Sequence, residues 1–197
     1  MRPLPFVFPH AVVFWLVWIW TFMPEWRIVQ QARIDSKNAD SKDAGSIRVI
    51  MAAMWISFLL SFVTAWVRLF AFPAGAQLYT FYVGVALFAL GSLLRRACWR
   101  ALGEFFTGDV RARADQPVIQ TGPYRWVRHP SYTAAMLIFI GIGLALGNWL
   151  SLALLTTGAV VAYGYRVKVE ERALVQEIGE PYVQYMRTHK RFVPGII

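Results

Sequence analysis

The sequence predicts an all-α, polytopic membrane protein with about five membrane-spanning helices, folded as a single domain over residues 1–197. Apolar residues make up 57% of the 197 residues and charged residues only 16%. A soluble globule usually carries about 25% charged residues. The apolar residues also lie in long runs separated by polar stretches. Helices that cross a bilayer need such runs, whereas soluble cores do not.

Each apolar run is close to the ~20 residues that a helix needs to cross the hydrocarbon layer. Pro73 and Gly75 break the chain after the second run, and Gly147 with Asn148 turns it tightly after the fourth. We expect spans at about 6–24, 47–71, 77–94, 131–146 and 149–165.

The last two spans are short, so helix must continue past the membrane edge. They predict a C-terminal helical hairpin whose second helix projects into water as "RVKVEERALVQEI". Gly179 is expected to cap this extension and Pro181 to prevent its continuation. The last segment, "YVQYMRTHKRF", places aromatic residues among basic ones and is expected at the membrane interface.

Basic residues predict the orientation of the chain. Lys and Arg number four in 25–46, seven in 95–130 and six in 166–197, but the turns at 73–76 and 147–148 hold none. With five spans the three basic stretches share one side, which the positive-inside rule makes cytoplasmic. The net charge of +9 thus fits lipid headgroups rather than nucleic acid. The single cysteine, Cys98, allows no internal disulfide and no cysteine-based zinc site, and no metal is expected.

The stretch "GPYRWVRHPSY", residues 122–132, crowds basic and aromatic side chains at the start of the fourth span. A simple interpretation is a positively charged membrane flank with Pro130 in the first turn of the helix. A helix N-terminus also presents free N–H groups and partial positive charge. With Arg128 and His129 beside it, this place suits an anionic group such as a carboxylate.

The stretch "RVKVEER", residues 166–172, places Arg166 and Glu170 on one helix face. They form either an exposed ion pair worth about 0.3–0.5 kcal/mol or a functional pair over the membrane surface. In the second case the carboxylate would hold an ammonium group and the guanidinium a second carboxylate. The residues alone leave both interpretations open.

The stretch "GIGLALG" imitates a glycine-rich nucleotide loop but lies inside a predicted span without a preceding strand. We expect Gly141, Gly143 and Gly147 to form a close helix-packing face instead.

Together, "GPYRWVRHPSY", the hairpin "GIGLALGNW" and "EERALVQEIGEPYVQYMRTHKRFVP" resemble the isoprenylcysteine carboxyl methyltransferase family. That family's pattern is G-x-Y-x-x-x-R-H-P-x-Y, a helical hairpin, R-x-x-x-E, and G-x-x-Y-x-x-Y before a basic residue and a final Pro. The resemblance covers about residues 100–195, and the earlier residues match only as generic spans. The matching residues are Gly122, Tyr124, Arg128, His129, Pro130, Tyr132, Arg166, Glu170, Gly179, Tyr182, Tyr185, Arg191 and Pro194.

The resemblance implies S-adenosylmethionine as methyl donor, held without a Rossmann domain in a cytoplasm-facing pocket over the hairpin. Arg166 aligns with the arginine that orients the methyl acceptor. A strip that lines the cofactor aligns with 116–119, but its side chains differ from the family's His-x-Leu-Val, which leaves contacts through backbone or through Val118 and Ile119. The expected cofactor contacts are Gln116, Pro117, Val118, Ile119, Tyr124, His129, Pro130, Ser131, Tyr132 and Glu170.

These residue types suit methyl transfer to a carboxylate, the family's best-known reaction being O-methylation of a C-terminal prenylcysteine. Such an acceptor is ionised at neutral pH, so the enzyme mainly supplies proximity, alignment and a dry site. Arg166 could fix the acceptor carboxylate with two parallel hydrogen bonds. The expected partners are membrane lipids and a lipid-tailed or small apolar acceptor that enters from the bilayer, with no nucleic acid and no obligate protein partner.

Three other functions remain open from the sequence. Phospholipid or small-amine N-methyltransferases share the hairpin and an acidic pair, which Glu170 and Glu171 also provide. Membrane sterol reductases carry a related R-H-x-x-Y signature and bind a nicotinamide cofactor, but they are usually larger. A non-catalytic membrane protein is the third. The acceptor is not identified, because the first three spans, where the resemblance fades, would form most of its binding surface.

Overall fold

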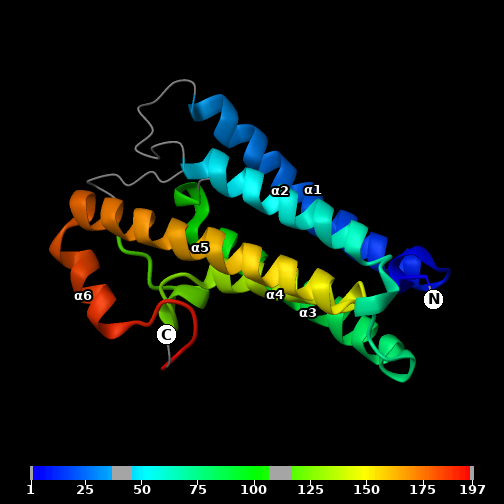
Figure 1. The fold of residues 1–197 in the computed structure, drawn as a ribbon. Coiled ribbons are helices and arrows are strands. Elements are labelled where there is room, and N and C mark those ends of the chain that lie inside the picture. Colours follow the sequence, from blue (N-terminus) through cyan, green and yellow to red (C-terminus); the bar gives the residue numbers. More distant parts are fainter. Residues whose placement is uncertain (1, 37–45, 107–116, 196–197) are drawn as a thin grey trace.

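The structure, a computed structural model, describes residues 2–36, 46–106 and 117–195, and the side chains of these residues except 27–36, 46–51 and 104. Within these ranges the chain is helical and has no β-strand, which confirms the all-α prediction. The short 3-10 helices are η1 (Leu4–Phe6), which precedes the first long helix, and η2 (Arg68–Phe70), η3 (Gly103–Phe105) and η4 (Gly122–Arg125), which lie between longer ones. The α-helices are α1 (His10–Ser36), α2 (Ser46–Thr64), α3 (Ala74–Leu102), α4 (Pro130–Ala145), α5 (Trp149–Ile178) and α6 (Glu180–Thr188) (Figure 1).

Three helices end elsewhere than the sequence predicts. α1 continues to Ser36, twelve residues beyond the expected end at 24. α3 continues eight residues beyond the expected end at 94, because its arginine-rich end favours helix until Gly103, with φ of 55°, terminates it. α2 ends at Thr64 rather than near 71. The Asn148 side-chain amide donates to the carbonyl oxygens of Thr64 and Val67, at 3.0 Å each, and so satisfies groups that a continuing helix would have paired.

A tight turn at Gly147 and Asn148 joins α4 to α5. Asn148 caps α5 by accepting hydrogen bonds from the backbone N–H groups of Leu150 and Ser151. α5 then runs 30 residues, far past the predicted span, and ends at Gly179 with φ of 72°. Pro181 does not end helical structure there but lies in the first turn of α6, where its missing N–H costs nothing.

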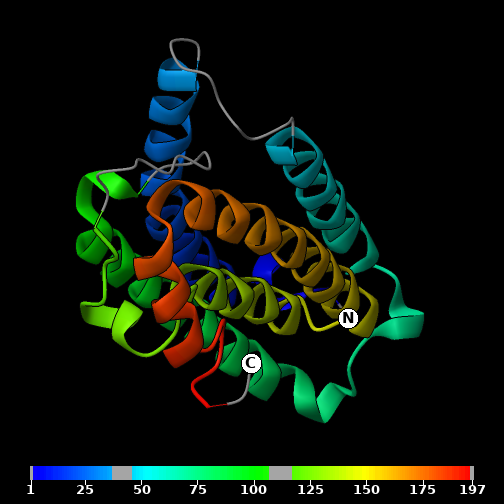
Figure 2. The same ribbon diagram turned by 90° about the vertical axis from the view of Figure 1, so that its left-hand side faces the viewer.

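α4 packs between α3 and α5, α2 packs along the other side of α5, and α1 packs against α3 (Figures 1 and 2). The glycine-rich stretch of α4 makes this close packing possible. A Cβ atom at Gly141 would lie 2.6 Å from the carbonyl oxygen of Gly84 in α3, and one at Gly143 would lie 2.8 Å from the Cα of Leu152 in α5. The predicted packing face is therefore confirmed at Gly141 and Gly143, but not at Gly147, which lies in the turn after α4 with φ of 68° and open space around it.

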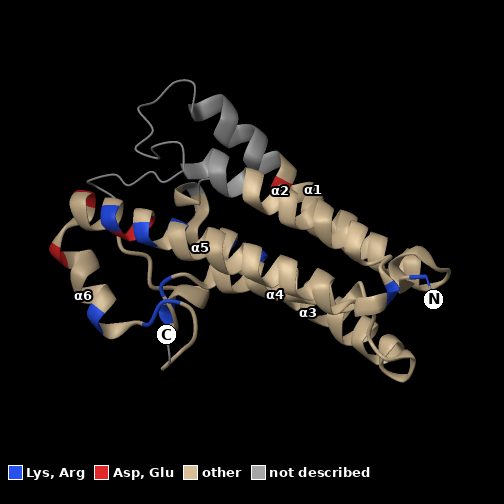
Figure 3. Cartoon of the chain, in the orientation of Figure 1, with Lys and Arg blue, Asp and Glu red and all other residues tan. Residues whose placement is uncertain are grey.

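The core of the bundle is apolar and rich in aromatic rings. Phe14, Phe81, Phe88 and Ile142 are fully buried, and rings from α1 and α2 pack around them. Charged side chains gather mainly at the end of the bundle where α6 and the C-terminus lie (Figure 3). The middle of the bundle carries few charges.

The outer faces of the helices are apolar and exposed. Leu16, Trp55, Leu59 and Leu90 are each more than half exposed, although they lie on three different helices. Apolar belts of this extent indicate contact with lipid. Among the described residues, α3 and α5 are long and apolar enough to cross a membrane, and Ala52–Thr64 and Pro130–Ala145 are shorter apolar helices. Five crossings therefore stay a prediction.

Candidate functional site

The candidate site lies at the charged end of the bundle, where α4 begins and α5 extends beyond the apolar core (Figure 3). The chain that follows α6 runs back across the start of α4. The backbone N–H of Arg128 donates to the carbonyl of Lys190 at 2.8 Å, and that of His129 to the carbonyl of Arg191 at 2.9 Å. The Thr133 hydroxyl donates to the Phe192 carbonyl at 2.8 Å. The two sequence motifs and the C-terminal segment thus form one assembly.

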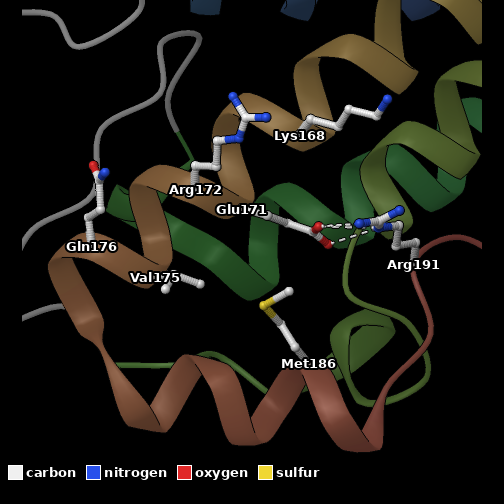
Figure 4. Close-up of a pocket in the computed structure, with 7 residues that line it drawn as sticks. All are labelled: Lys168, Glu171, Arg172, Val175, Gln176, Met186 and Arg191. Carbon is white, nitrogen blue, oxygen red and sulfur yellow. Dashed lines mark hydrogen bonds and ion pairs between the residues drawn. The ribbon is translucent and has the colours of Figure 1, made fainter.

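Glu171 is the centre of this assembly. Its side chain is 6% exposed and lies 3.2 Å from Nη1 of Arg128 and 3.2 Å from Nε2 of His129. Arg191 donates to the same carboxylate through Nη2 at 2.8 Å and through Nε at 3.2 Å (Figure 4). A carboxylate accepts hydrogen bonds only, so the His129 nitrogen that faces it carries a proton.

The surroundings of Glu171 keep it ionised. Burial by itself would raise the pKa of this carboxyl, but hydrogen bonds from His129 and Arg191 and the charge of Arg128 outweigh it and lower the pKa to about 2. Glu171 lies beyond the predicted span that ends at 165. It is a permanent anion at neutral pH, already surrounded by donors.

Glu170 points to a different partner. It accepts a hydrogen bond of 2.5 Å from the Tyr132 hydroxyl. Arg166 is only 7% exposed and interacts with the same tyrosine. The interpretation of Arg166 and Glu170 as an exposed ion pair is therefore wrong, because Arg166 is buried where α4 and α5 meet.

Aromatic side chains enclose this part of the site. Tyr132 stacks on Tyr163 and on His129, with ring centroids 5.1 Å and 5.6 Å apart. Tyr185 is buried and donates to the carbonyl of Tyr124 at 2.6 Å. Burial raises the pKa of Tyr185 to about 12 and also raises the pKa of Tyr124, so both phenols stay neutral. The walls of the site are aromatic, with hydroxyl groups as neutral donors.

Two buried donors at this end have no hydrogen-bond partner among the described residues. They are Nε of Arg128 and Nε1 of Trp99. Buried donors are normally paired, so unpaired ones in a polar cluster point to an absent ligand with acceptor atoms. An open hollow of about 560 Å³ lies at the same end of the bundle, between α5, α6 and the C-terminal segment (Figure 4). Its lining residues are Lys168, Glu171, Arg172, Val175, Gln176, Met186 and Arg191.

The structure brings most of the predicted site residues to this end of the bundle. Tyr124 and the run from His129 to Tyr132 lie with Arg166 and Glu170, although up to 46 residues separate them in sequence. Pro117 is exposed, Val118 and Ile119 are half-buried, and Gln116 lies outside the described residues. The roles of all these residues stay predictions.

The sequence suggested an anion beside Arg128, but it did not predict that Glu171 is this anion or that Arg191 joins the pair. Their signal was present, since "RHP", "EE" and "KRF" each place charge where an apolar chain has little need of it. Only the folded chain shows that the three stretches meet.

Comparison with known proteins agrees with this architecture. A model of the family described as phospholipid methyltransferase matches residues 79–180, just over half of the chain. The chain therefore belongs to the phospholipid methyltransferase family.

Curated relatives confirm the resemblance inferred from the motifs. The chain is 26% identical to protein-S-isoprenylcysteine O-methyltransferase of Dictyostelium discoideum over 143 residues, which are 72% of this chain and 60% of that protein. It is 30% identical to the Saccharomyces cerevisiae protein of the same name over 127 residues, which are 64% of this chain and 53% of that protein. The matched region thus spans little more than half the length of these relatives.

A solved structure shares the fold. It is a eukaryotic intramembrane Ras methyltransferase, isoprenylcysteine carboxyl methyltransferase, with a TM-score of 0.57 and 22% sequence identity. The match covers 78% of this chain and 53% of that one.

Proposed function

We propose that this chain is an integral-membrane methyltransferase that uses S-adenosylmethionine to methylate the carboxylate of a prenylcysteine-like or other lipid-tailed acceptor. One observation carries the proposal. Tyr132, Arg166 and Glu170, from two separate motifs, meet in a buried aromatic cluster within the segment that the family model matches. The names of the curated relatives support the same reaction.

The residues present fit the methyl donor, which carries an ammonium, a carboxylate and a purine ring. Glu170 can hold the ammonium, because its partner Tyr132 is a neutral hydroxyl. The Nε–H of Arg128, which has no partner among the described residues, can donate to the donor's carboxylate. Tyr124 and Tyr182 offer buried aromatic surface for the purine.

When bound, S-adenosylmethionine would supply an electrophilic methyl carbon, so that a carboxylate acceptor would become a methyl ester and the sulfonium a neutral thioether. No proton has to move, so the chain needs no strong base. Its residues align the acceptor and exclude water. Arg166, buried beside Tyr132, is placed to hold the acceptor carboxylate. The exposed apolar faces of α1, α2 and α3 leave room for a lipid tail in the bilayer.

N-methylation of a phospholipid or small amine is the second candidate, because the matching family is described as phospholipid methyltransferase. An acceptor ammonium would need a carboxylate with free acceptor capacity. Glu171 is surrounded by His129, Arg128 and Arg191, which leaves Glu170 as the available member of the acidic pair. The same Glu170 is the residue that suits the donor's ammonium, so the geometry favours O-methylation.

One experiment separates these functions. The full chain in nanodiscs is incubated with methyl-labelled S-adenosylmethionine and either N-acetyl-S-farnesylcysteine or phosphatidylethanolamine. We expect label in the farnesylcysteine that mild base releases, as for a methyl ester. Base-stable label in phosphatidylethanolamine would instead establish N-methylation. Binding of NADPH without binding of S-adenosylmethionine would indicate a reductase. Binding of neither compound would indicate a non-catalytic protein.

We further propose that the chain crosses the membrane five times with the site facing the cytoplasm. The alternation of basic and uncharged connections supports this orientation. Position 40, in the first basic stretch, lies outside the described residues, so Gly75→Cys and Gln176→Cys are the informative pair. Native Cys98 is fully buried and gives a low background. A membrane-impermeant thiol reagent applied to intact cells should label position 75 and spare position 176, and the reverse result would invert the topology.

A further inference from the structure

An ion pair between the first and third helices lies next to the candidate site. Arg95 of α3 donates through Nε to Oε1 of Glu25 in α1, and through Nη2 to Oε2 at 3.0 Å. The two side chains are 18% and 19% exposed. Both residues immediately follow predicted spans, where an ionised side chain is costly unless it is paired.

Arg95 also reaches α4. Its third donor group, Nη1, lies 3.3 Å from the carbonyl oxygen of Ser131, in the first turn of α4. The guanidinium carbon lies 5.9 Å and 5.7 Å from the ring centroids of Trp99 and Phe106, which restrict its position further. Ser131 directly precedes Tyr132, whose hydroxyl holds Glu170. A continuous series of contacts therefore runs from α1 to the site.

We propose that Arg95 is a positioning residue, oriented by Glu25, which fixes the first turn of α4 and thereby the direction of the Tyr132 hydroxyl. The inference rests on the proposed function and deepens it. Glu25 lies outside the segment 79–180 that the family model matches. This chain therefore couples its first helix to a site built by its last helices.

The geometry needs both the charge and the shape of the two side chains. A guanidinium offers donors in a rigid planar fork, so two can engage Glu25 while a third engages the Ser131 carbonyl. A lysine at position 95 could not make all three bonds. Without the Glu25 carboxylate, the guanidinium has no counter-charge in this pair and is expected to turn toward water, away from Ser131.

Arg96 provides a matched control. It also joins α3 to α1, by donating to the Trp20 carbonyl at 2.5 Å and by lying 4.4 Å from the Trp20 ring centroid. Within the described part of the chain it makes no hydrogen bond or ion pair with α4. Loss of Arg96 should therefore weaken the contact between α1 and α3 without disturbing Tyr132.

The test measures methyl transfer from S-adenosylmethionine to N-acetyl-S-farnesylcysteine, together with donor affinity by calorimetry and thermal unfolding, for the full chain in nanodiscs. Glu25→Gln and Arg95→Lys should each lower kcat about tenfold, whereas Glu25→Asp and Arg96→Gln should stay within about threefold of wild type. Two independent variants keep the test valid if one of them fails to fold. A purely structural pair would lower the unfolding temperature without lowering kcat of the folded enzyme.

Coupling to Tyr132 is tested by a double-variant cycle. In a Tyr132→Phe background, Glu25→Gln should change kcat less than about twofold, because the hydroxyl that it positions is already absent. Three results would each overturn the inference. Glu25→Gln and Arg95→Lys could both keep the wild-type kcat, or Arg96→Gln could lose as much kcat as they do. Glu25→Gln could also lower kcat a full tenfold in the Tyr132→Phe background. A wild-type protein that transfers no methyl group would instead remove the proposed function, and that outcome is visible before any variant is made.

Discussion

The two ends of the helix bundle both bury polar side chains, but they do so in different ways. At the end formed by the turn between α4 and α5, Asn148 is fully buried and neutral. It caps α5 and donates to the carbonyls of Thr64 and Val67. The Ser151 hydroxyl donates to the Ser61 carbonyl at 2.6 Å. These neutral groups connect α2 to the turn between α4 and α5 by hydrogen bonds.

At the opposite end several of the buried polar groups are ionised. Glu171 is surrounded by Arg128, His129 and Arg191. The preceding residue, Glu170, accepts a hydrogen bond from Tyr132. The Arg128 guanidinium still has a buried N–H without a partner among the described residues. A neutral network whose groups hydrogen-bond to one another stabilises a fold. A charged network that also has buried donors without partners can bind a ligand as well. The following predictions test that distinction.

The largest expected effect is at the centre of the charged end. Glu171→Gln keeps the size of the side chain but leaves Arg128, His129 and Arg191 without their common anion. Removal of one partner from a buried ion pair typically costs about 3–5 kcal/mol. We expect a loss of folding stability on this scale, measured by thermal unfolding in nanodiscs, together with loss of donor binding. A stable Glu171→Gln protein that binds the donor normally would show that this cluster contributes neither to folding stability nor to donor binding.

At the neutral end, Asn148→Ala should affect stability alone. It removes the cap of α5 and one of the donors to each of the Thr64 and Val67 carbonyls, which keep the backbone N–H groups of Val67 and Phe70. The combined cost should be roughly 2–4 kcal/mol. The rate of methyl transfer per folded molecule should match wild type. Active-site titration with labelled donor can measure the number of folded molecules. Reduced turnover in the folded fraction would mean that the two ends are not separate in function.

Arg166→Lys probes the charged end without removing charge. If Arg166 holds an acceptor carboxylate in a bidentate manner, lysine cannot reproduce the geometry. Turnover should then fall by roughly 1–3 kcal/mol in transition-state terms, while the calorimetric affinity for the donor stays near normal. A fully active Arg166→Lys enzyme would argue against a carboxylate acceptor and in favour of N-methylation.

The smallest effect is expected at an exposed ion pair of the same charged end. Glu180 and Arg187 in α6 lie 3.8 Å apart, with side chains 63% and 72% exposed. Exposed pairs contribute about 0–1 kcal/mol, so Glu180→Gln should leave both stability and turnover near wild type. A large effect here would mean that charge at this end acts through its general field rather than through the buried contacts.

Local features of the fold could be predicted from the sequence. The Gly147–Asn148 turn, the Gly179 helix end and the Gly141–Gly143 packing face depend on residues that are close in sequence. The end of α2 could not be predicted in this way. It depends on Asn148, 84 residues after Thr64, and nothing near Thr64 in the sequence signals that contact.

The candidate site shows the same division. The resemblance to a family placed Tyr132, Arg166 and Glu170 together, and the structure brings them into one cluster. The R-x-x-x-E pattern singled out Glu170 in the sequence, but the pairing of Glu171 with Arg191 could not be predicted, because only packing decides which carboxylate meets which partner. The pairing of Glu25 with Arg95, 70 residues apart, likewise needs the folded chain.

Hydrogen–deuterium exchange of the full chain, with and without S-adenosylmethionine, tests the central claim most directly. If the charged end holds the donor, its binding should slow exchange in 117–133 and 166–194, because those backbone segments build the cluster. Exchange in 61–76 and 145–151, at the neutral end, should stay unchanged. Protection at the neutral end, or no protection anywhere at saturating S-adenosylmethionine, would contradict the account.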